Sequence, residues 1–299
     1  MARPRDARIR CRSEPAGMTD AISPQLRYAD GLHVRYAETQ PVDGSTVLLL
    51  NPWPESLYAW EALWPRLSER ARLVAIDLPG FGKSEARDDL YSPRAMGQFL
   101  ITLIDEWQLG RPHVFGPDVG TGATLFAAAQ EPDALTSAVV GSGGSAFPLE
   151  VTGPLKEMIE SPDLEALRAV DGRDAVANTL TLLENYEPSD TARQDYLDSY
   201  AGTRFAESAR YVRSYPTDLA TLHGLLPEIR TPIQIIAGAR DSLVPPANAE
   251  YLVDRVPNSQ LALLDTGHFA WEDGAEEWGS IALDWIQGGY RLATGVRGE

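Results

Sequence analysis

Short runs of apolar residues recur along the chain, and segments with helical spacing separate them. These runs cover residues 46–50, 73–76, 113–115 and 138–140. A strand that is buried on both faces has this pattern, because helices cover both faces of a parallel sheet. The alternation predicts an α/β fold with a mostly parallel central sheet and helices on both faces. Residues 25–36 alternate around Asp30-Gly31 and predict a hairpin before the first of these runs.

The strand pattern stops at Phe147-Pro148 and resumes only at residues 233–236 and 261–264. The residues between are polar, helical in spacing and poor in strand signals. We therefore expect a core built from residues 18–147 and 226–299, with a helical cap over residues 148–225 inserted into it. Helices of the core are expected over residues 57–67, 93–109, 121–130, 248–256 and 275–286.

The N-terminal residues 1–17 differ from the rest in charge. They hold arginines at positions 3, 5, 8, 10 and 12 against Asp6 and Glu14. No apolar stretch accompanies them, so a secretory signal is not expected. We expect a disordered extension, or a start codon assigned too early with Met18 as the true start; a basic interaction arm is the weaker alternative.

The charge balance excludes several classes of partner. The chain has 43 acidic and 26 basic residues and a net charge of −17. Nucleic acids and anionic membranes attract basic surfaces, so neither is expected as a partner. The single cysteine, Cys11, excludes an internal disulfide framework, and no apolar run approaches the ~18 residues of a membrane span. We expect a soluble, cytoplasmic protein that is a monomer or a homodimer.

The segment Gly116-Pro117-Asp118-Val119-Gly120 lies directly between a predicted strand and a predicted helix. It has the G-x-Nu-x-G pattern of the nucleophile elbow, in which the middle residue occupies a strained turn above the sheet. Here that residue is Asp118. The alternative is that Asp118 only caps the following helix.

Two further candidates follow later strands. Asp241 follows the strand at residues 233–236, and His268 follows the strand at residues 261–264. The carboxyl ends of parallel strands meet at one edge of a sheet, so both are expected beside Asp118. The order of nucleophile, acid and histidine is that of a hydrolase triad. The alternatives are a turn aspartate and a loop histidine without a role.

Together with Asn51-Pro52-Trp53-Pro54 and Asp77-Leu78-Pro79-Gly80-Phe81-Gly82-Lys83-Ser84, these segments resemble the α/β-hydrolases of the epoxide hydrolase and haloalkane dehalogenase branch. The resemblance covers residues 25–290 and implies the α/β-hydrolase fold with a helical cap. It also implies an oxyanion hole built from the backbone N–H groups of Trp53 and Val119. Two departures lie beside that hole: Asn51-Pro52 stands where the family has His-Gly, and Pro117 stands where it has His.

The aspartate restricts the reaction. A carboxylate with an ordinary pKa near 3.9 is ionised at neutral pH and can attack a saturated carbon to form an alkyl ester. Attack on an ester or amide would give an anhydride, so esterase and peptidase functions are disfavoured. His268 would then activate a water that hydrolyses the Asp118 ester, and Asp241 would orient the imidazole. No metal and no cofactor is expected.

The leaving group separates the remaining alternatives. Dehalogenases stabilise halide with indole or amide N–H groups, but Val119 follows Asp118 and the insert has no tryptophan. Epoxide hydrolases donate a proton from cap phenols, and the insert has five tyrosines. Tyr211 best resembles the family's catalytic tyrosine, with Tyr215 close behind; the family's first cap tyrosine has no clear counterpart. Packing without catalysis is the alternative for each.

An apolar pocket is expected around these groups. We expect its aromatic lining to include Trp53, Phe147, Phe269, Trp271 and Tyr186, with core packing as the alternative. The leading hypothesis is hydrolysis of a small apolar epoxide to a vicinal diol. Haloalkane dehalogenation by the same triad is the first alternative. A ligand-binding protein that has lost turnover is the second.

Overall fold

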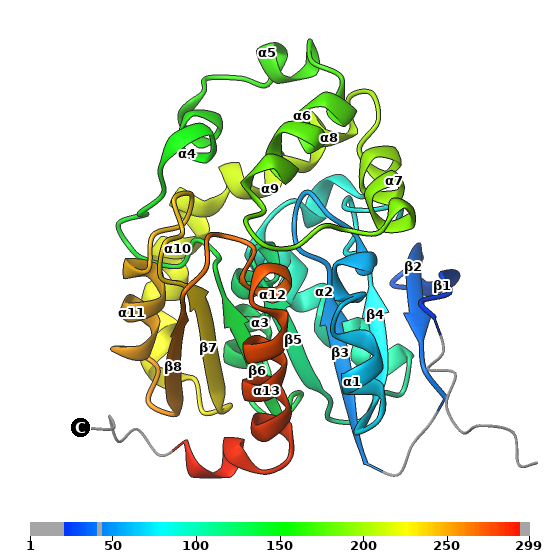
Figure 1. Cartoon of the computed structure of the whole chain (residues 1–299). Helices are drawn as coiled ribbons and strands as arrows, with labels where there is room; N and C mark the ends of the chain where they lie inside the picture. Colours follow the sequence, from blue (N-terminus) through cyan, green and yellow to red (C-terminus); the bar gives the residue numbers. More distant parts are fainter. Residues whose placement is uncertain (1–20, 41–43, 294–299) are drawn as a thin grey trace, which may run out of the picture.

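The computed structural model describes residues 21–40 and 44–293, and in this part of the chain the strands form one mixed sheet (Figure 1). The order across the sheet is β1-β2-β4-β3-β5-β6-β7-β8. The strands are β1 Gln25–Ala29, β2 Leu32–Glu38, β3 Ser45–Leu50, β4 Ala71–Ile76, β5 His113–Pro117, β6 Ser137–Gly141, β7 Ile233–Gly238 and β8 Ser259–Leu264. The predicted extension at residues 1–17, with Cys11, lies outside the described residues.

The sheet is parallel from β4 to β8 and antiparallel only at β1 and β2. The predicted hairpin at Asp30-Gly31 is confirmed, and both residues have positive φ, 48° and 76°. Positive φ at both central residues is what the type I′ turn of a two-residue hairpin requires.

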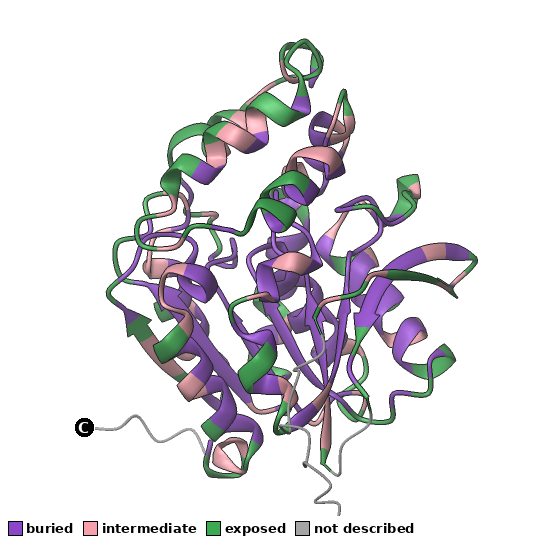
Figure 2. Ribbon diagram, turned by 45° about the vertical axis from the view of Figure 1, so that its right-hand side comes forward, coloured by how far each residue is buried: buried purple, intermediate pink, exposed green. Residues whose placement is uncertain are grey.

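Helices pack on both faces, as predicted. The core helices are α1 Trp64–Ser68, α2 Pro93–Glu106, α3 Val119–Gln130, α11 Ala247–Val253, α12 Ala270–Asp273 and α13 Ala275–Ile286. Alternate residues of β3 face opposite sides: Leu48 and Leu50 join the cluster under α2 and α3, while Val47 and Leu49 join the cluster under α1 and α13. Figure 2 shows the sheet buried between these layers.

The helix predicted over residues 57–67 is wrong in extent. The structure has a 3₁₀ turn η1 at Leu57–Trp60 and a separate short helix, α1, that begins at Trp64. Pro65 is the cause, since proline lacks an N–H and is tolerated only in the first turn of a helix. The other short turns are η2 Asp88–Leu90, η3 Leu180–Leu182, η4 Leu226–Glu228 and η5 Gly289–Leu292.

The chain between β6 and β7 is helical. The inserted helices are α4 Gly153–Glu160, α5 Glu165–Arg168, α6 Gly172–Thr179, α7 Asp190–Ser199, α8 Arg204–Ser208, α9 Arg210–Arg213 and α10 Tyr215–Leu225. Helices α4 to α9 lie over the carboxyl ends of the strands, whereas α10 packs beside α2 and α3 (Figure 1). Helices α4 and α5 bury no residue fully and form the outer rim (Figure 2).

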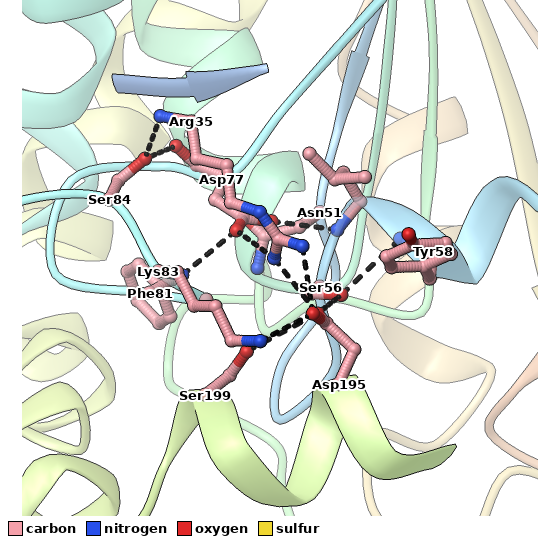
Figure 3. A network of polar contacts seen from close by, with 12 residues as sticks. Arg35, Asn51, Ser56, Tyr58, Asp77, Phe81, Lys83, Ser84, Asp195 and Ser199 are labelled. Carbon is pink, nitrogen blue, oxygen red and sulfur yellow. Dashed lines mark hydrogen bonds and ion pairs between the residues drawn. The ribbon is translucent and has the colours of Figure 1, made fainter. Parts of the chain in front are cut away.

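An ionic network joins α7 to the core (Figure 3). Both carboxylate oxygens of Asp195 accept from the Arg35 guanidinium of β2, at 2.8 and 2.7 Å. The Lys83 ammonium lies 2.6 Å and the Ser56 hydroxyl 2.7 Å from the same carboxylate. Arg35 also reaches Asp77 at 3.2 Å. The network fixes one inserted helix to three separate segments of the core.

No helix within residues 21–40 and 44–293 is long and apolar enough to cross a membrane.

Candidate active site

Asp118 lies at the turn between β5 and α3. Its backbone has φ 51° and ψ −121°, a strained conformation for a residue with a side chain. The Asp118 N–H donates to the carbonyl of Gly141 at 2.8 Å, which holds the turn. A Cβ atom at Gly116 would collide with the Thr124 hydroxyl and the Gly120 carbonyl. The glycines of the motif therefore allow the close approach that lifts the Asp118 side chain above the sheet.

The two carboxylate oxygens of Asp118 have different surroundings. Oδ2 accepts from the Trp53 backbone N–H at 2.6 Å, and the backbone N–H of Val119 also bonds to the carboxylate. Oδ1 lies 3.7 Å from Nε2 of His268, too far for a hydrogen bond. The Trp53 N–H thus holds Oδ2, whereas Oδ1 is the oxygen nearer His268.

His268 is oriented by Asp241. Nδ1 of the imidazole lies 2.8 Å from Oδ2 of Asp241. The other oxygen, Oδ1, accepts from the N–H groups of Leu243 and Val244, both at 2.9 Å. The structure therefore brings Asp118, Asp241 and His268 together at the carboxyl ends of β5, β7 and β8, in the arrangement of a triad.

Burial and charge shift both titrating groups of the triad. Burial raises the pKa of Asp118 to about 6, although the charge of His268 and the Trp53 N–H oppose it. Burial lowers the pKa of His268, but the Asp241 carboxylate, followed by Asp118, outweighs this and raises it to about 9. At neutral pH the resting site consequently holds an Asp118 carboxylate beside an imidazolium.

A cavity of about 390 Å³ lies between the triad and the inserted helices. Its lining is largely apolar and consists of Trp53, Pro54, Asp118, Gly144, Pro154, Leu155, Met158, Leu167, Ala175, Asn178, Thr179, Leu182, Phe205, Val212, Tyr215, Leu243, Val244 and His268. The Trp53 ring stacks on Phe205 at 4.9 Å, and its indole N–H donates to the Ser208 hydroxyl at 2.8 Å.

The two tyrosine candidates lie in different places. Tyr215 lines the cavity, where burial and then the charge of Asp118 raise its pKa well above the ordinary value. The Tyr211 hydroxyl instead donates to the backbone carbonyl of Val119 at 2.9 Å, and its ring packs edge-on against Phe81. Tyr211 does not line the cavity.

Four other aromatic candidates also lie outside the cavity lining. Phe269 is fully buried and packs edge-on against the rings of His268 and Trp271. The Trp271 indole N–H donates to Glu55 at 3.0 Å. Phe147 is 40% exposed at the surface, and Tyr186 is half-buried with its N–H bonded to Asp273.

Several lining residues were not among the predictions. Leu155, Met158 and Leu167 come from α4 and α5, and Asn178 comes from α6. The amphipathic spacing of these helices indicates an apolar face, but nothing in the spacing indicates that this face covers the triad rather than a core.

The Asn51 departure has a structural role. The Asn51 side-chain carbonyl accepts from the Leu78 N–H at 2.7 Å, and its amide donates to the carbonyl of Pro52 at 2.9 Å. Asn51 therefore shapes the loop that presents the Trp53 N–H. Within the described part of the chain, no group of three or more His, Cys, Asp or Glu residues is arranged to hold a metal ion.

Comparison with known proteins agrees with this geometry. Residues 45–275 match the protein family described as alpha/beta hydrolase fold. The chain belongs to this family. Among curated α/β-hydrolase relatives, an uncharacterized hydrolase, YugF of Bacillus subtilis, is 25% identical, with 90% of this chain and 100% of the relative aligned. A haloalkane dehalogenase of Bradyrhizobium diazoefficiens is 26% identical over 91% of this chain and 97% of its own length.

Solved structures of α/β-hydrolases share the fold. The epoxide hydrolase VrEH1 of Vigna radiata superposes with a TM-score of 0.73 at 18% identity, over 91% of this chain and 99% of that one. The sequence-based expectation of an α/β-hydrolase fold with a mostly parallel sheet is confirmed.

Proposed function

We propose that this hydrolase opens an epoxide to a vicinal diol through a covalent ester on Asp118. The observation that carries the proposal is the Asp118 carboxylate, which has one oxygen held by the Trp53 N–H and faces an apolar cavity that Tyr215 also lines. An apolar cavity suits a small uncharged substrate, which is the partner that we propose.

In the first step, Oδ1 of Asp118 attacks a ring carbon and displaces the ring oxygen. The alkoxide then takes a proton. Tyr215 is our candidate donor, because its phenol lines the cavity and its raised pKa keeps the proton in place. Tyr211 is the weaker candidate, since its hydroxyl already donates to Val119.

In the second step, water attacks the Asp118 carbonyl carbon while His268 removes one of its protons. The ester C–O bond then breaks, the departing diol oxygen takes that proton from the imidazolium, and the second water proton returns to the Tyr215 phenolate, which leaves the Asp118 carboxylate restored. The developing negative charge falls on Oδ2, where the Trp53 N–H already lies 2.6 Å away. Esterification also neutralises Asp118, which removes one of the charges that raise the pKa of His268. A larger fraction of the imidazole is consequently neutral, and able to accept a proton, after the ester has formed.

Haloalkane dehalogenation is the second candidate. The 26% identity with a haloalkane dehalogenase supports it, and the same triad could attack a carbon–halogen bond. Halide release calls for N–H donors at the cavity, but the Trp53 indole is bonded to Ser208. The Asn178 amide also lines the cavity and is the donor that we would assign to this reaction.

The test is trapping of the ester. His268→Gln should accumulate an adduct on Asp118, seen by intact mass, because the ester forms but is not hydrolysed. An epoxide adds its whole mass, whereas a haloalkane adds only its alkyl group and releases halide. The control Asp118→Asn/His268→Gln should add nothing. If neither substrate class gives an adduct, the covalent mechanism is wrong.

Isotope labelling gives an independent test. Turnover in ¹⁸O-labelled water should place the label in the Asp118 carboxylate, since water attacks the enzyme's own ester. Product from a single turnover should carry no label. Asp118→Asn should lose about 10⁴-fold or more in kcat, as other triad nucleophile and base variants do. Label in the first product would indicate direct attack by water and contradict the ester.

A further inference from the structure

Two glutamate side chains are buried close to the triad, and the mechanism above uses neither. Glu55 is fully buried, and Glu272 is 2% exposed. Neither lines the cavity. Two buried carboxylates without a cation are costly, because each loses its hydration and each repels the other. Their environment therefore requires an explanation.

Each carboxyl group has one oxygen with a donor and one without. Glu55 Oε2 accepts from the Trp271 indole at 3.0 Å, and Glu272 Oε1 accepts from the Tyr196 hydroxyl of α7 at 3.1 Å. The remaining oxygens, Glu55 Oε1 and Glu272 Oε2, are buried and have no donor. The two carboxyl groups are neighbours, because the Trp271 indole that donates to Glu55 belongs to the residue directly before Glu272. A hydrogen bond between them requires one carboxyl to be protonated.

We propose that Glu55 and Glu272 hold one proton between their two unpaired oxygens, and that this acid pair positions the loop of residues 51–56 against the turn that carries His268. Glu55 lies two residues after Trp53, and Glu272 lies four residues after His268 on α12. Both glutamates are thus positioning residues, in an assignment that rests on the proposed roles of Trp53 and His268.

The pair also reaches the inserted helices. The Tyr196 hydroxyl bonds to Glu272, and the Tyr200 hydroxyl donates to the backbone carbonyl of Glu55 at 2.8 Å. Both tyrosines belong to the α7 region, which lies over the core in Figure 1. The acid pair therefore joins the oxyanion loop, the histidine turn and an inserted helix at one buried point.

The charges around the pair favour retention of the proton. Burial, and then the neighbouring carboxylate, raise the pKa of Glu55; burial also raises the pKa of Glu272. The titratable groups that act on the pair from the surrounding elements are Asp118, His268, Glu61, Asp273, Tyr186 and Tyr196. His268 is the one base among them, and it is already paired with Asp241.

Glutamine substitution tests the shared proton. In Glu55→Gln or Glu272→Gln, the amide oxygen can keep the Trp271 or Tyr196 contact while the NH₂ group donates to the remaining carboxylate. Each single variant therefore imitates the protonated pair. In the double variant the two NH₂ groups face each other unless one amide turns, and a turned amide in place of Glu272 requires the Tyr196 hydroxyl to change from donor to acceptor. We expect the double variant to lose about 10²-fold in kcat relative to either single variant, the cost of misplaced catalytic groups.

Infrared spectroscopy gives a direct readout that needs no substrate. At pH 7.5, the wild-type spectrum should show the C=O band of a protonated carboxylic acid, shifted in D₂O. This band should disappear in both single glutamine variants and remain in the exposed control Glu276→Gln. An Asp118→Asn background removes any contribution from the nucleophile. Because this experiment is independent of turnover, loss of the proposed reaction would not obscure its result.

Stability against pH supplies the third readout. An acid whose folded pKa is raised contributes stability at low pH that is lost as the pH rises through the folded pKa. The unfolding temperature of the wild type should therefore fall relative to that of Glu272→Gln as the pH increases. In the wild type, kcat should also fall when the pair loses its proton at alkaline pH. The pH profile of kcat for Glu272→Gln should lack this fall. Three results would overturn the acid pair. The infrared band could be absent from the wild type, or it could be retained in both single variants. The double variant could also have the same kcat as the single variants.

Discussion

The Asp195 network offers a sharp test of how the inserted helices are held to the core. Asp195→Asn preserves the shape of the side chain but removes its charge. The Arg35 and Asp195 side chains are only 10% and 9% exposed, so the guanidinium would remain buried without its main partner. Breaking a buried ion pair in this way costs about 3–5 kcal/mol.

The contribution of each Asp195 contact to the free energy of unfolding can be ranked from the exposure of the side chain that makes it. The Lys83 side chain is 40% exposed, so its 2.6 Å contact with Asp195 adds at most a fraction of a kcal/mol (about 0–1) in water. Because the asparagine oxygen can still accept one hydrogen bond, we expect the lower limit, about 3 kcal/mol. For a chain of 299 residues, with an unfolding entropy of about 2.1 cal/mol/K per residue, that corresponds to a fall of roughly 5 °C in the unfolding temperature.

The assay is differential scanning calorimetry at pH 7.5, with Asp190→Asn as the matched control. Asp190 begins the same helix and is exposed, so the same chemical change there should cost about 0.3–1 kcal/mol. Burial opposes ionisation of Asp195, but the Arg35 and Lys83 hydrogen bonds outweigh it and lower its pKa. Its stabilising effect is therefore present above the unfolded pKa of about 3.9 and lost in stronger acid. If Asp195→Asn costs no more than Asp190→Asn at pH 7.5, the network does not stabilise the protein.

Three further predictions concern the reaction. The alkylation rate, followed by stopped-flow tryptophan fluorescence, should fall as the pH drops through about 6, since protonated Asp118 cannot attack. In His268→Gln this fall should occur at higher pH, because the charge of His268 no longer lowers the pKa of Asp118. An unchanged pH profile would contradict the electrostatic coupling between the two residues. Tyr215→Phe should reduce kcat for epoxides by about 10²–10⁴-fold, the usual contribution of a general acid, with a smaller effect of Tyr211→Phe; the reverse order would exchange their roles. Met158→Trp should reduce kcat/KM for bulky epoxides by about tenfold or more while sparing small ones; equal losses across a substrate series would place Met158 away from the substrate.

The strand ends explain why the triad positions could be predicted from the sequence. Asp118, Asp241 and His268 each follow a strongly apolar strand, and a parallel sheet places such positions at one edge. The turn residues around them are local signals as well. The Gly116 and Gly120 spacing depends on contacts between residues only a few positions apart. It can therefore be recognised from the sequence alone.

The surroundings of the triad depend on long-range packing and could not be predicted in the same way. Tyr211 and Tyr215 are four residues apart, so helical spacing alone does not distinguish them. Only the docking of α9 and α10 directs one phenol to Val119 and the other into the cavity. Trp271 was expected in the aromatic lining of the pocket, but α12 turns its indole toward Glu55, 216 residues away in the chain.

The hydrogen bond from the Trp53 N–H to Oδ2 of Asp118 has a consequence for substrate choice. In a site with a small hydroxyl nucleophile, such donors are vacant until a substrate carbonyl arrives. Here the nucleophile's own oxygen fills them in the resting state. An incoming ester or amide would have to compete with a charged ligand that is covalently tethered 2.6 Å from the donor. With Asp118 as the nucleophile that we propose, acyl substrates are disfavoured by prior occupancy as well as by the chemistry of the carboxylate, and the elbow selects between reaction classes before any substrate contacts the cavity wall.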